Sequence, residues 1–121
     1  MIKVVAAFRR NPERSMEEFS AYYFEHHPAL FRSETPPEVM AGVSHYVQNH
    51  ARPLGAGDPP FDCVTEIGFT GMDALHAWNA WYFGEGGRAL RDDEDHFMDK
   101  GSRVIVVTDE RVPVGFPQPA H

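Results

Sequence analysis

The sequence predicts an α+β domain in which two helices cover one face of a four-stranded antiparallel sheet. Apolar runs of strand length stand near both ends of the chain, at residues 2–8 and 104–107. Between them, two segments that begin near residues 16 and 73 repeat apolar residues at helical spacing. In chain order the pattern is strand, helix, strand, strand, helix, strand, which predicts a βαββαβ layer.

The first strand and helix follow from local signals. Residues 2–8 form an apolar run short enough for a strand that is buried on both sides. Ser15 and Glu18 then make the Ser-x-x-Glu pattern that caps a helix N-terminus. Pro28 is expected to kink or restart this helix, because proline lacks the amide donor, and Pro36 with Pro37 ends the region. One apolar stripe along the helix comprises Met16, Phe19, Tyr23 and Leu30.

The second strand, residues 45–50 (HYVQNH), has an unusual number of groups that hold or move protons. Side chains alternate between the faces of a strand, so Tyr46, Gln48 and His50 share one face. Neither face is cleanly apolar, and buried polar groups need hydrogen-bond partners. The segment is therefore either an edge strand or the wall of a polar pocket, and its own residues leave both interpretations open.

The second half of the chain completes the pattern. Residues 52–62 are rich in Pro and Gly and predict an exposed loop, and residues 63–69 predict a strand. A helix is expected at 73–82, a break at 84–87, a shorter helix at 89–98 and the last strand at 103–108. We expect one domain over residues 1–110 and a proline-rich extended tail over 111–121, with no internal repeat.

A sheet with both helices on one face is a ferredoxin-like fold, and its other face then needs a cover. The first and last strands are apolar on both faces, so the uncovered face would be an exposed apolar patch. A second copy of the sheet, packed face to face about a two-fold axis, would cover it. We therefore expect a homodimer. Val112, Val114 and Phe116 alternate along the tail, which we expect to pack across the partner subunit.

Composition narrows the functional classes. The formal charge of −7 and the small number of basic residues argue against nucleic acid and anionic membrane surfaces as partners. We find no apolar run of membrane-spanning length and no signal-peptide pattern at the start. Cys63 is the single cysteine, so an internal disulfide and a thiolate cluster are excluded, and we expect a cytoplasmic protein.

Seven histidines raise the question of a metal site, but their spacing does not favour one. His45 and His50 face opposite sides of a strand, and the chain has no HExxH or His-x-His pair, so we expect no metal. Acid–base chemistry suits histidine better, since it titrates near neutrality. His26 and His27 flank the apolar helix stripe about equally, so periodicity does not choose between them.

Several motifs in order resemble the EthD family of dimeric α/β-barrel proteins. The resemblance covers residues 2–110. It rests on residues 9–15 with Glu18-Phe19, residues 22–27 (YYFEHH), residues 46–50 (YVQNH), Phe61-Asp62 with Glu66 in the third strand, and the acidic segment of Asp93-Glu94 with Phe97 and Asp99. It places the family's signature histidine on His27. Tyr23 stands where the family usually has Trp, and Gly68 where it has an aromatic residue, and we expect both to enlarge the pocket.

The resemblance implies a pocket between sheet and helices. We expect His27, Tyr46 and Asp93 to be catalytic, with His27 as general acid or base and Asp93 orienting a pocket histidine. Tyr46, with Gln48, would donate hydrogen bonds to a developing enolate oxygen. The residues expected to bind the substrate are Tyr23, Gln48, His50, Glu66 and Phe97.

The leading functional hypothesis is a cofactor-free lyase, dehydratase, isomerase or cyclase acting on a small, largely apolar carbonyl or aromatic polyketide-like compound. A cofactor-independent oxygenase of phenolic aromatics needs the same pocket and base, and the sequence does not separate the two. The third hypothesis is a non-catalytic protein that binds a small apolar or aromatic ligand, because fold does not fix function.

Overall fold

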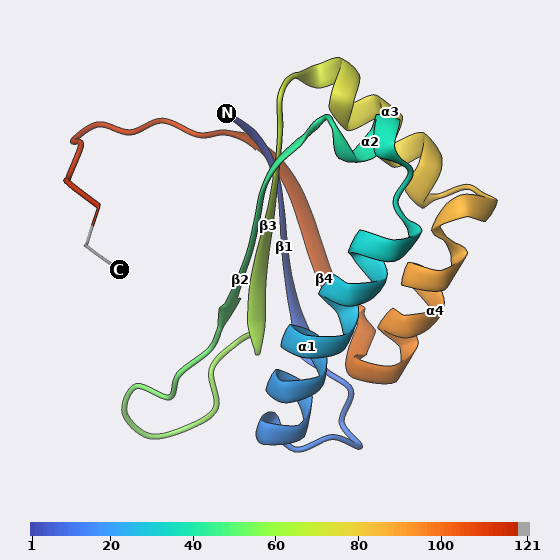
Figure 1. The fold of residues 1–121 in the computed structure, drawn as a ribbon. Helices are drawn as coiled ribbons and strands as arrows, with labels where there is room; N and C mark the ends of the chain where they lie inside the picture. Colours follow the sequence, from blue (N-terminus) through green and yellow to red (C-terminus); the bar gives the residue numbers. More distant parts are fainter. Residues whose placement is uncertain (119–121) are drawn as a thin grey trace.

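The computed structural model describes residues 1–118 and contains one antiparallel sheet. Strands β1 (Ile2–Arg10), β2 (Val43–His50), β3 (Cys63–Phe69) and β4 (Met98–Asp109) lie in the order β2-β3-β1-β4. Helices α1 (Met16–Glu34), α3 (Met72–Tyr82) and α4 (Arg88–Phe97) lie on one face of the sheet (Figure 1). Two short helical segments, α2 (Pro37–Met40) and η1 (Glu85–Gly87), complete the chain order. This topology confirms the predicted ferredoxin-like α+β fold.

Helix α1 begins as its cap predicts and then passes through its proline. The Ser15 hydroxyl accepts from the Glu18 amide at 3.1 Å, and the Glu18 carboxylate accepts from the Ser15 amide at 3.0 Å. Pro28 lies inside the helix, so the expected restart there is wrong. Proline deprives only the carbonyl four residues earlier of its donor. That residue is Phe24, which is 68 % exposed, so water can reach this turn.

Strand β4 is longer than the predicted 103–108. It begins at Met98, directly after α4 ends at Phe97, and Asp99 pairs with Arg9 beyond a register shift in β1. The polar residues 99–102 lack the apolar alternation that marks a strand. Pairing with β1 therefore draws residues 98–102 into the strand, although their local pattern does not predict one.

The two faces of the sheet receive alternate residues of each strand. Between the helix-covered face and the helices lie two core clusters, which meet along the strands. One is built around Phe8, Phe19 and Phe97, and the other around Phe69, Leu75 and Trp78. Strand β2 is an edge strand, and it also turns Tyr46 towards the helices. The edge-strand interpretation of this polar segment is therefore confirmed.

The opposite face of the sheet has no cover within the described chain. Val104 and Val106 are 58 % and 52 % exposed there. Lys3 is buried on the same face, where it forms ion pairs with Glu66, at 2.7 Å, and with Glu110. No helix within residues 1–118 is both long and apolar enough to cross a membrane.

The tail leaves β4 on the side of the sheet opposite the helices (Figure 1). Residues 111–118 form no strand or helix, and Val112, Val114 and Phe116 are 62–79 % exposed. The remainder of the predicted tail, residues 119–121, lies outside the described residues. Packing across a partner therefore stays a prediction.

Candidate functional site

A cavity of about 250 Å³ lies between the helices and the covered face of the sheet. It is situated where the two core clusters meet, and its walls are mainly apolar. Three of the lining residues are exposed: Phe83 at 65 %, Ile105 at 49 % and Val107 at 52 %. The cavity therefore opens between the end of α3 and the edge strand β4. An apolar cavity with a few converging polar groups is the usual form of a small-molecule site.

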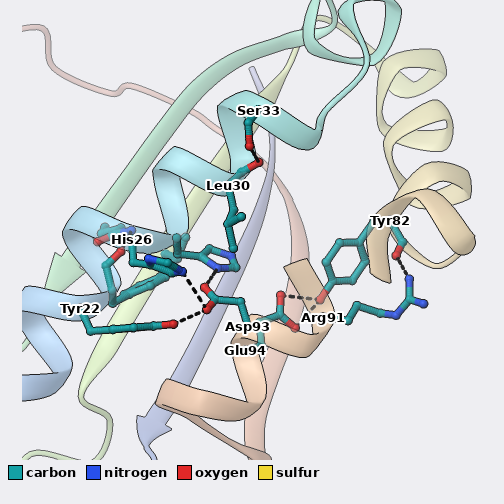
Figure 2. A network of polar contacts seen from close by, with 12 residues as sticks. Tyr22, His26, Leu30, Ser33, Tyr82, Arg91, Asp93 and Glu94 are labelled. Carbon is teal, nitrogen blue, oxygen red and sulfur yellow. Dashed lines mark hydrogen bonds and ion pairs between the residues drawn. The ribbon is translucent and has the colours of Figure 1, made fainter. Parts of the chain in front are cut away.

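A buried histidine and a buried aspartate meet at the inner wall of this cavity. His27 comes from α1 and Asp93 from α4, and both are at most 8 % exposed. The His27 Nδ1 atom lies 2.8 Å from Asp93 Oδ2, and the Tyr22 hydroxyl donates to Asp93 Oδ1 at 2.5 Å. Figure 2 shows Tyr22 and His26 converging on Asp93. The expected pairing of Asp93 with a pocket histidine is present in this geometry.

The ionisation of this cluster follows from its contacts. Burial by itself raises the pKa of Asp93, but hydrogen bonds from His27 and Tyr22 outweigh it and leave that pKa below its usual value. Burial and the adjacent Asp93 carboxylate raise the pKa of Tyr22 to about 12. At neutral pH the aspartate is therefore an anion and the tyrosine a neutral donor.

The structure distinguishes the two adjacent histidines. The His26 side chain is 52 % exposed, stacks on Tyr22 and lies 3.6 Å from Asp93 Oδ1. The His27 side chain is 10 % exposed and lines the cavity. Its ring packs edge-on against Phe97, with the ring centroids 5.0 Å apart. It also packs at a tilt of 47° against Tyr23, with the ring centroids 5.6 Å apart. The cavity-facing histidine is His27.

Among the described residues, the Nε2 atom of His27 makes no hydrogen bond. Because the Asp93 carboxylate can only accept at Nδ1, the neutral form of the ring carries its proton on Nδ1 and its lone pair on Nε2. The second nitrogen is thus available as a proton acceptor towards the cavity. This is the arrangement that a general base requires.

Tyr46 lines the same cavity from β2. Its hydroxyl oxygen accepts from Gln48 Nε2 at 3.0 Å, which leaves its own proton free to be donated. Burial raises the pKa of Tyr46, so the phenol stays protonated at neutral pH. Gln48 itself does not line the cavity. It lines an outer groove between α1 and β2 and positions the Tyr46 hydroxyl.

A second polar cluster lies towards the mouth of the cavity. The Tyr82 hydroxyl lies 2.6 Å from both carboxylate oxygens of Glu94, and Arg103 Nη1 lies 3.2 Å from Glu94 Oε1. All three residues line the cavity. Gly87 permits this contact between helices, since a Cβ there would lie 2.5 Å from the Tyr82 Cα. Figure 2 shows Glu94 directed towards Tyr82 while Asp93 faces Tyr22.

The structure places six of the predicted site residues in the cavity wall or in contact with a residue of that wall that they position, Gln48 being the one that contacts Tyr46, and it places the others elsewhere. His27, Tyr46, Tyr23 and Phe97 line the cavity, and Asp93 supports His27. His50 lies beside the core, where it bonds Ser20 and Gln48 and does not line the cavity.

Glu66 and Gly68 face the open side of the sheet. Glu66 pairs there with Lys3 and accepts from Asn49. Gly68 pairs with Lys3 and His45, and a Cβ on it would lie 2.7 Å from the His45 Cβ. The expectation that Gly68 enlarges the pocket is therefore wrong, because odd and even positions of β3 face opposite sides.

Sequence reasoning missed Tyr22, Tyr82 and Arg103 as parts of the site. The sequence did contain a signal for the acids that these residues contact, Asp93 and Glu94. The buried residues of α4 are Leu90, Asp93, Glu94 and Phe97, at helical positions i, i+3, i+4 and i+7. This spacing places both acids on the buried stripe, and buried carboxylates need partners. Those partners come from other elements and leave no local signal. Within residues 1–118, no group of three or more His, Cys, Asp or Glu is placed to hold a metal ion.

Comparison with solved structures shows the same fold. An EthD family protein from Bacillus halodurans C-125 is 21 % identical, with a TM-score of 0.64 over 92 % of this chain and 99 % of that one. HapK from Hahella chejuensis is 13 % identical, with a TM-score of 0.62 over 98 % and 100 %. A dimeric protein of unknown function with a ferredoxin-like fold, from Bacteroides fragilis NCTC 9343, is 12 % identical, with a TM-score of 0.58 over 90 % and 95 %.

Sequence comparison identifies the family. No curated protein matches the chain significantly. The EthD domain model matches residues 11–101, which is well over half of the 121 residues and includes every side chain of the His27–Asp93–Tyr22 cluster. On this match, together with the ferredoxin-like fold, the chain belongs to the EthD family.

Proposed function

We propose that this protein is an acid–base enzyme, a lyase or isomerase, that acts on a small and largely apolar carbonyl compound. One observation carries the proposal. A histidine held by a buried carboxylate presents a free nitrogen to an apolar cavity of about 250 Å³. The reaction needs only side chains of the chain itself, namely His27 as base and acid, Asp93 as its support and Tyr46 as hydrogen-bond donor.

The first step is proton abstraction next to the carbonyl. The lone pair on His27 Nε2 takes the proton, and the electron pair of the broken C–H bond moves into an enolate. Asp93 stabilises the imidazolium, because it is a buried anion 2.8 Å from Nδ1. A well-placed base contributes about 10²–10⁴ in rate.

The enolate oxygen needs a donor, and Tyr46 provides one. Its phenol lines the same cavity, stays protonated, and already accepts from Gln48, so its own proton is directed elsewhere. A preorganised donor in an apolar cavity stabilises developing negative charge more strongly than water does.

The second step returns the proton from His27 Nε2. Delivered to a hydroxyl leaving group on the β-carbon, it releases water and leaves a double bond. In a β,γ-unsaturated carbonyl compound the anion is a dienolate, and delivery of the proton to its γ-carbon completes an isomerisation. Both outcomes regenerate neutral His27, so the same residues account for either reaction.

Hydrogen–deuterium exchange tests the first step without the natural substrate. Bicyclic aryl ketones such as 1-tetralone are incubated with the protein in D₂O, and loss of the proton next to the carbonyl is followed by NMR. We expect exchange above the buffer rate with the wild type. His27→Ala should reduce the enzyme-dependent rate by about 10²–10⁴.

His76→Ala is the matched control, since His76 is exposed on α3 and does not line the cavity. It should exchange like the wild type. Equal rates for His27→Ala and the wild type would reject the assignment of His27 as the base. A neighbour of similar fold is described as an antibiotic biosynthesis monooxygenase, so oxygen consumption is measured in parallel. Oxygen uptake that depends on a phenolic probe would replace the lyase or isomerase proposal with an oxygenase.

We also propose that two copies pair through the open face of the sheet. Exposed valines on that face support it, and so does the burial of Lys3 among acidic partners there, which prepares a flat surface. Two proteins of similar fold are described as dimeric. Sedimentation of the wild type as a monomer at micromolar concentration would reject this pairing.

A further inference from the structure

The cluster at the mouth of the cavity has donors that the protein itself does not use. Arg103 carries five N–H donors. Within the described chain its interactions with Glu94, at 3.2 Å, and with the Tyr82 hydroxyl, at 3.3 Å, both use Nη1. The Nη2 and Nε groups have no protein partner among residues 1–118. The side chain is 20 % exposed, so these donors are partly withdrawn from water.

The charges around this cluster leave room for an anion. Glu94 is the buried carboxylate, and two cations approach it, Arg103 at 3.2 Å and Lys100 at 3.9 Å. Asp95, which also pairs with Lys100, is 64 % exposed and is screened by water. Tyr82 remains a neutral phenol, because burial and Glu94 raise its pKa. Among the residues that line the cavity, the charges of Arg103 and Glu94 therefore balance, and Lys100, outside that lining, adds a second cation close to Glu94.

The position of Arg103 relates it to His27. Arg103 precedes Ile105 by two residues on β4, so both side chains share the cavity-facing side of the strand, next to the opening. His27 lies at the inner wall, where its side chain is 10 % exposed. The acids that position the two groups, Asp93 and Glu94, are adjacent on α4 and point in different directions (Figure 2). Apolar side chains line the space between these two polar ends.

We infer that the ligand of this cavity is an aromatic or alicyclic carboxylate, whose carboxylate is bound by Arg103 at the cavity mouth and whose apolar ring extends towards His27. This deepens the proposed function by naming a substrate class and rests on it only for the reaction at His27. Planar guanidinium groups bind carboxylates through two parallel hydrogen bonds, which Nη2 and Nε can supply together. Because the chain carries a charge of −7, its overall field opposes anion binding, and the local cation has to provide the attraction.

The test compares 2-naphthoate with 2-naphthamide, which have the same shape and differ in charge. Isothermal titration calorimetry at pH 7 measures the dissociation constant of each for the full chain. We expect the wild type to bind the naphthoate at least tenfold more tightly than the amide. In Arg103→Met this preference should fall to about one, and Arg103→Lys should retain part of it. Arg52→Met, which changes an exposed loop arginine, should keep the wild-type preference.

Removing Arg103 alone takes the nearer of its two cations from the buried Glu94. The double variant Glu94→Gln/Arg103→Met removes the pair together and keeps the test decisive if the single variant does not fold. A wild type without preference for the acid, or a folded variant lacking Arg103 that retains the preference, would overturn the inference. His27→Ala should bind both probes with the wild-type preference. His27→Ala therefore tests the proposed base through proton exchange, whereas the Arg103 variants test carboxylate binding through calorimetry. Failure of one proposal can thus be told from failure of the other.

Discussion

The two faces of the sheet are built by the same four strands, yet they differ in how their polar groups are satisfied. On the covered face, helices bring the partners: α1 and α4 join His27, Tyr22 and Asp93. On the open face, Lys3 pairs with Glu66 from a nearby strand and with Glu110 directly after β4, whereas the buried His45 Nε2, 3.4 Å from Glu66, makes no hydrogen bond within the described residues. The covered face encloses a cavity, whereas the open face leaves Val104 and Val106 more than half exposed.

The difference teaches that polar groups have different roles on the two faces. Lys3 pairs with both Glu66 and Glu110 within the open face, so its charge already has partners when another protein surface packs there. The covered face retains groups with unused capacity, namely Nε2 of His27 and the outer donors of Arg103. Unused hydrogen-bonding capacity beside a cavity is a mark of ligand recognition, since a purely structural site would satisfy it.

The largest expected effect comes from a charge on the open face. Val106→Asp places a carboxylate in the row that also contains Val5 and Glu66. Each proposed dimer loses two buried valines, about 1.5 kcal/mol each, so the dissociation constant should rise at least about 100-fold. Analytical ultracentrifugation measures it. The control, Leu54→Asp, changes a loop residue that is 98 % exposed and should leave association unchanged. An unaltered dimer in Val106→Asp would place the interface elsewhere.

A smaller effect is expected from the carboxylate on the covered face. Asp93→Asn should lower the free energy of unfolding at pH 7 by about 1–3 kcal/mol, because one of the donors from His27 and Tyr22 then meets an amide group. Urea denaturation measures this loss. Glu66→Gln on the open face is the comparison, and it should cost less because Lys3 keeps its second carboxylate partner, Glu110.

The pH dependence of the same variants sharpens the comparison. The pKa of Asp93 is lowered in the folded protein, so its contribution to stability is present above the unfolded value of about 3.9 and is lost as the pH falls through the folded value. The wild type should therefore lose stability progressively as the pH falls below about 5. Asp93→Asn should show a shallower decline, with the remainder due to Glu66 and Glu110, whose pKa values are also lowered. Identical slopes would show that Asp93 is not ionised as described.

The smallest effect is expected from the tail. Deleting residues 111–121 removes exposed Val112, Val114 and Phe116, which leave the sheet on its open side. If the tail packs across the partner, the deletion should raise the dimer dissociation constant by less than Val106→Asp does. The cavity and its exchange activity should be retained. A dissociation constant equal to that of the wild type would show that the tail takes no part in association.

Much of the fold was predictable because local chemistry determines it. The Ser15–Glu18 cap, the break before α4 and strand β3 at Cys63–Phe69 are where the sequence places them. The predicted start of the last strand was wrong, because pairing with β1 draws residues 98–102 into β4 although their pattern is polar, and Pro28 does not restart α1. In both places, contacts made by the rest of the element offset a locally unfavourable residue.

The candidate site was only partly predictable for a related reason. Resemblance to the family selected His27 over His26, a choice that periodicity left open, and the burial of His27 agrees with it. The helical spacing of Asp93 and Glu94 placed both acids on one buried stripe. Their partners Tyr22, Tyr82 and Arg103 lie on three other elements, and no spacing within the chain connects them.

The sequence by itself determined the order of helices and strands, the ferredoxin-like layer and the need to cover a second apolar face. Apolar periodicity, helix caps and helix-breaking residues act over a few neighbouring residues, so they can be recognised directly in the sequence. Only the tertiary structure decided on which face of the sheet each polar side chain lies. It places Glu66 on the open face, away from the cavity, and Arg103 in the cavity wall. The reason is that a side chain's chemistry depends on partners that folding brings from distant positions, as Asp93 shows with His27, 66 residues away.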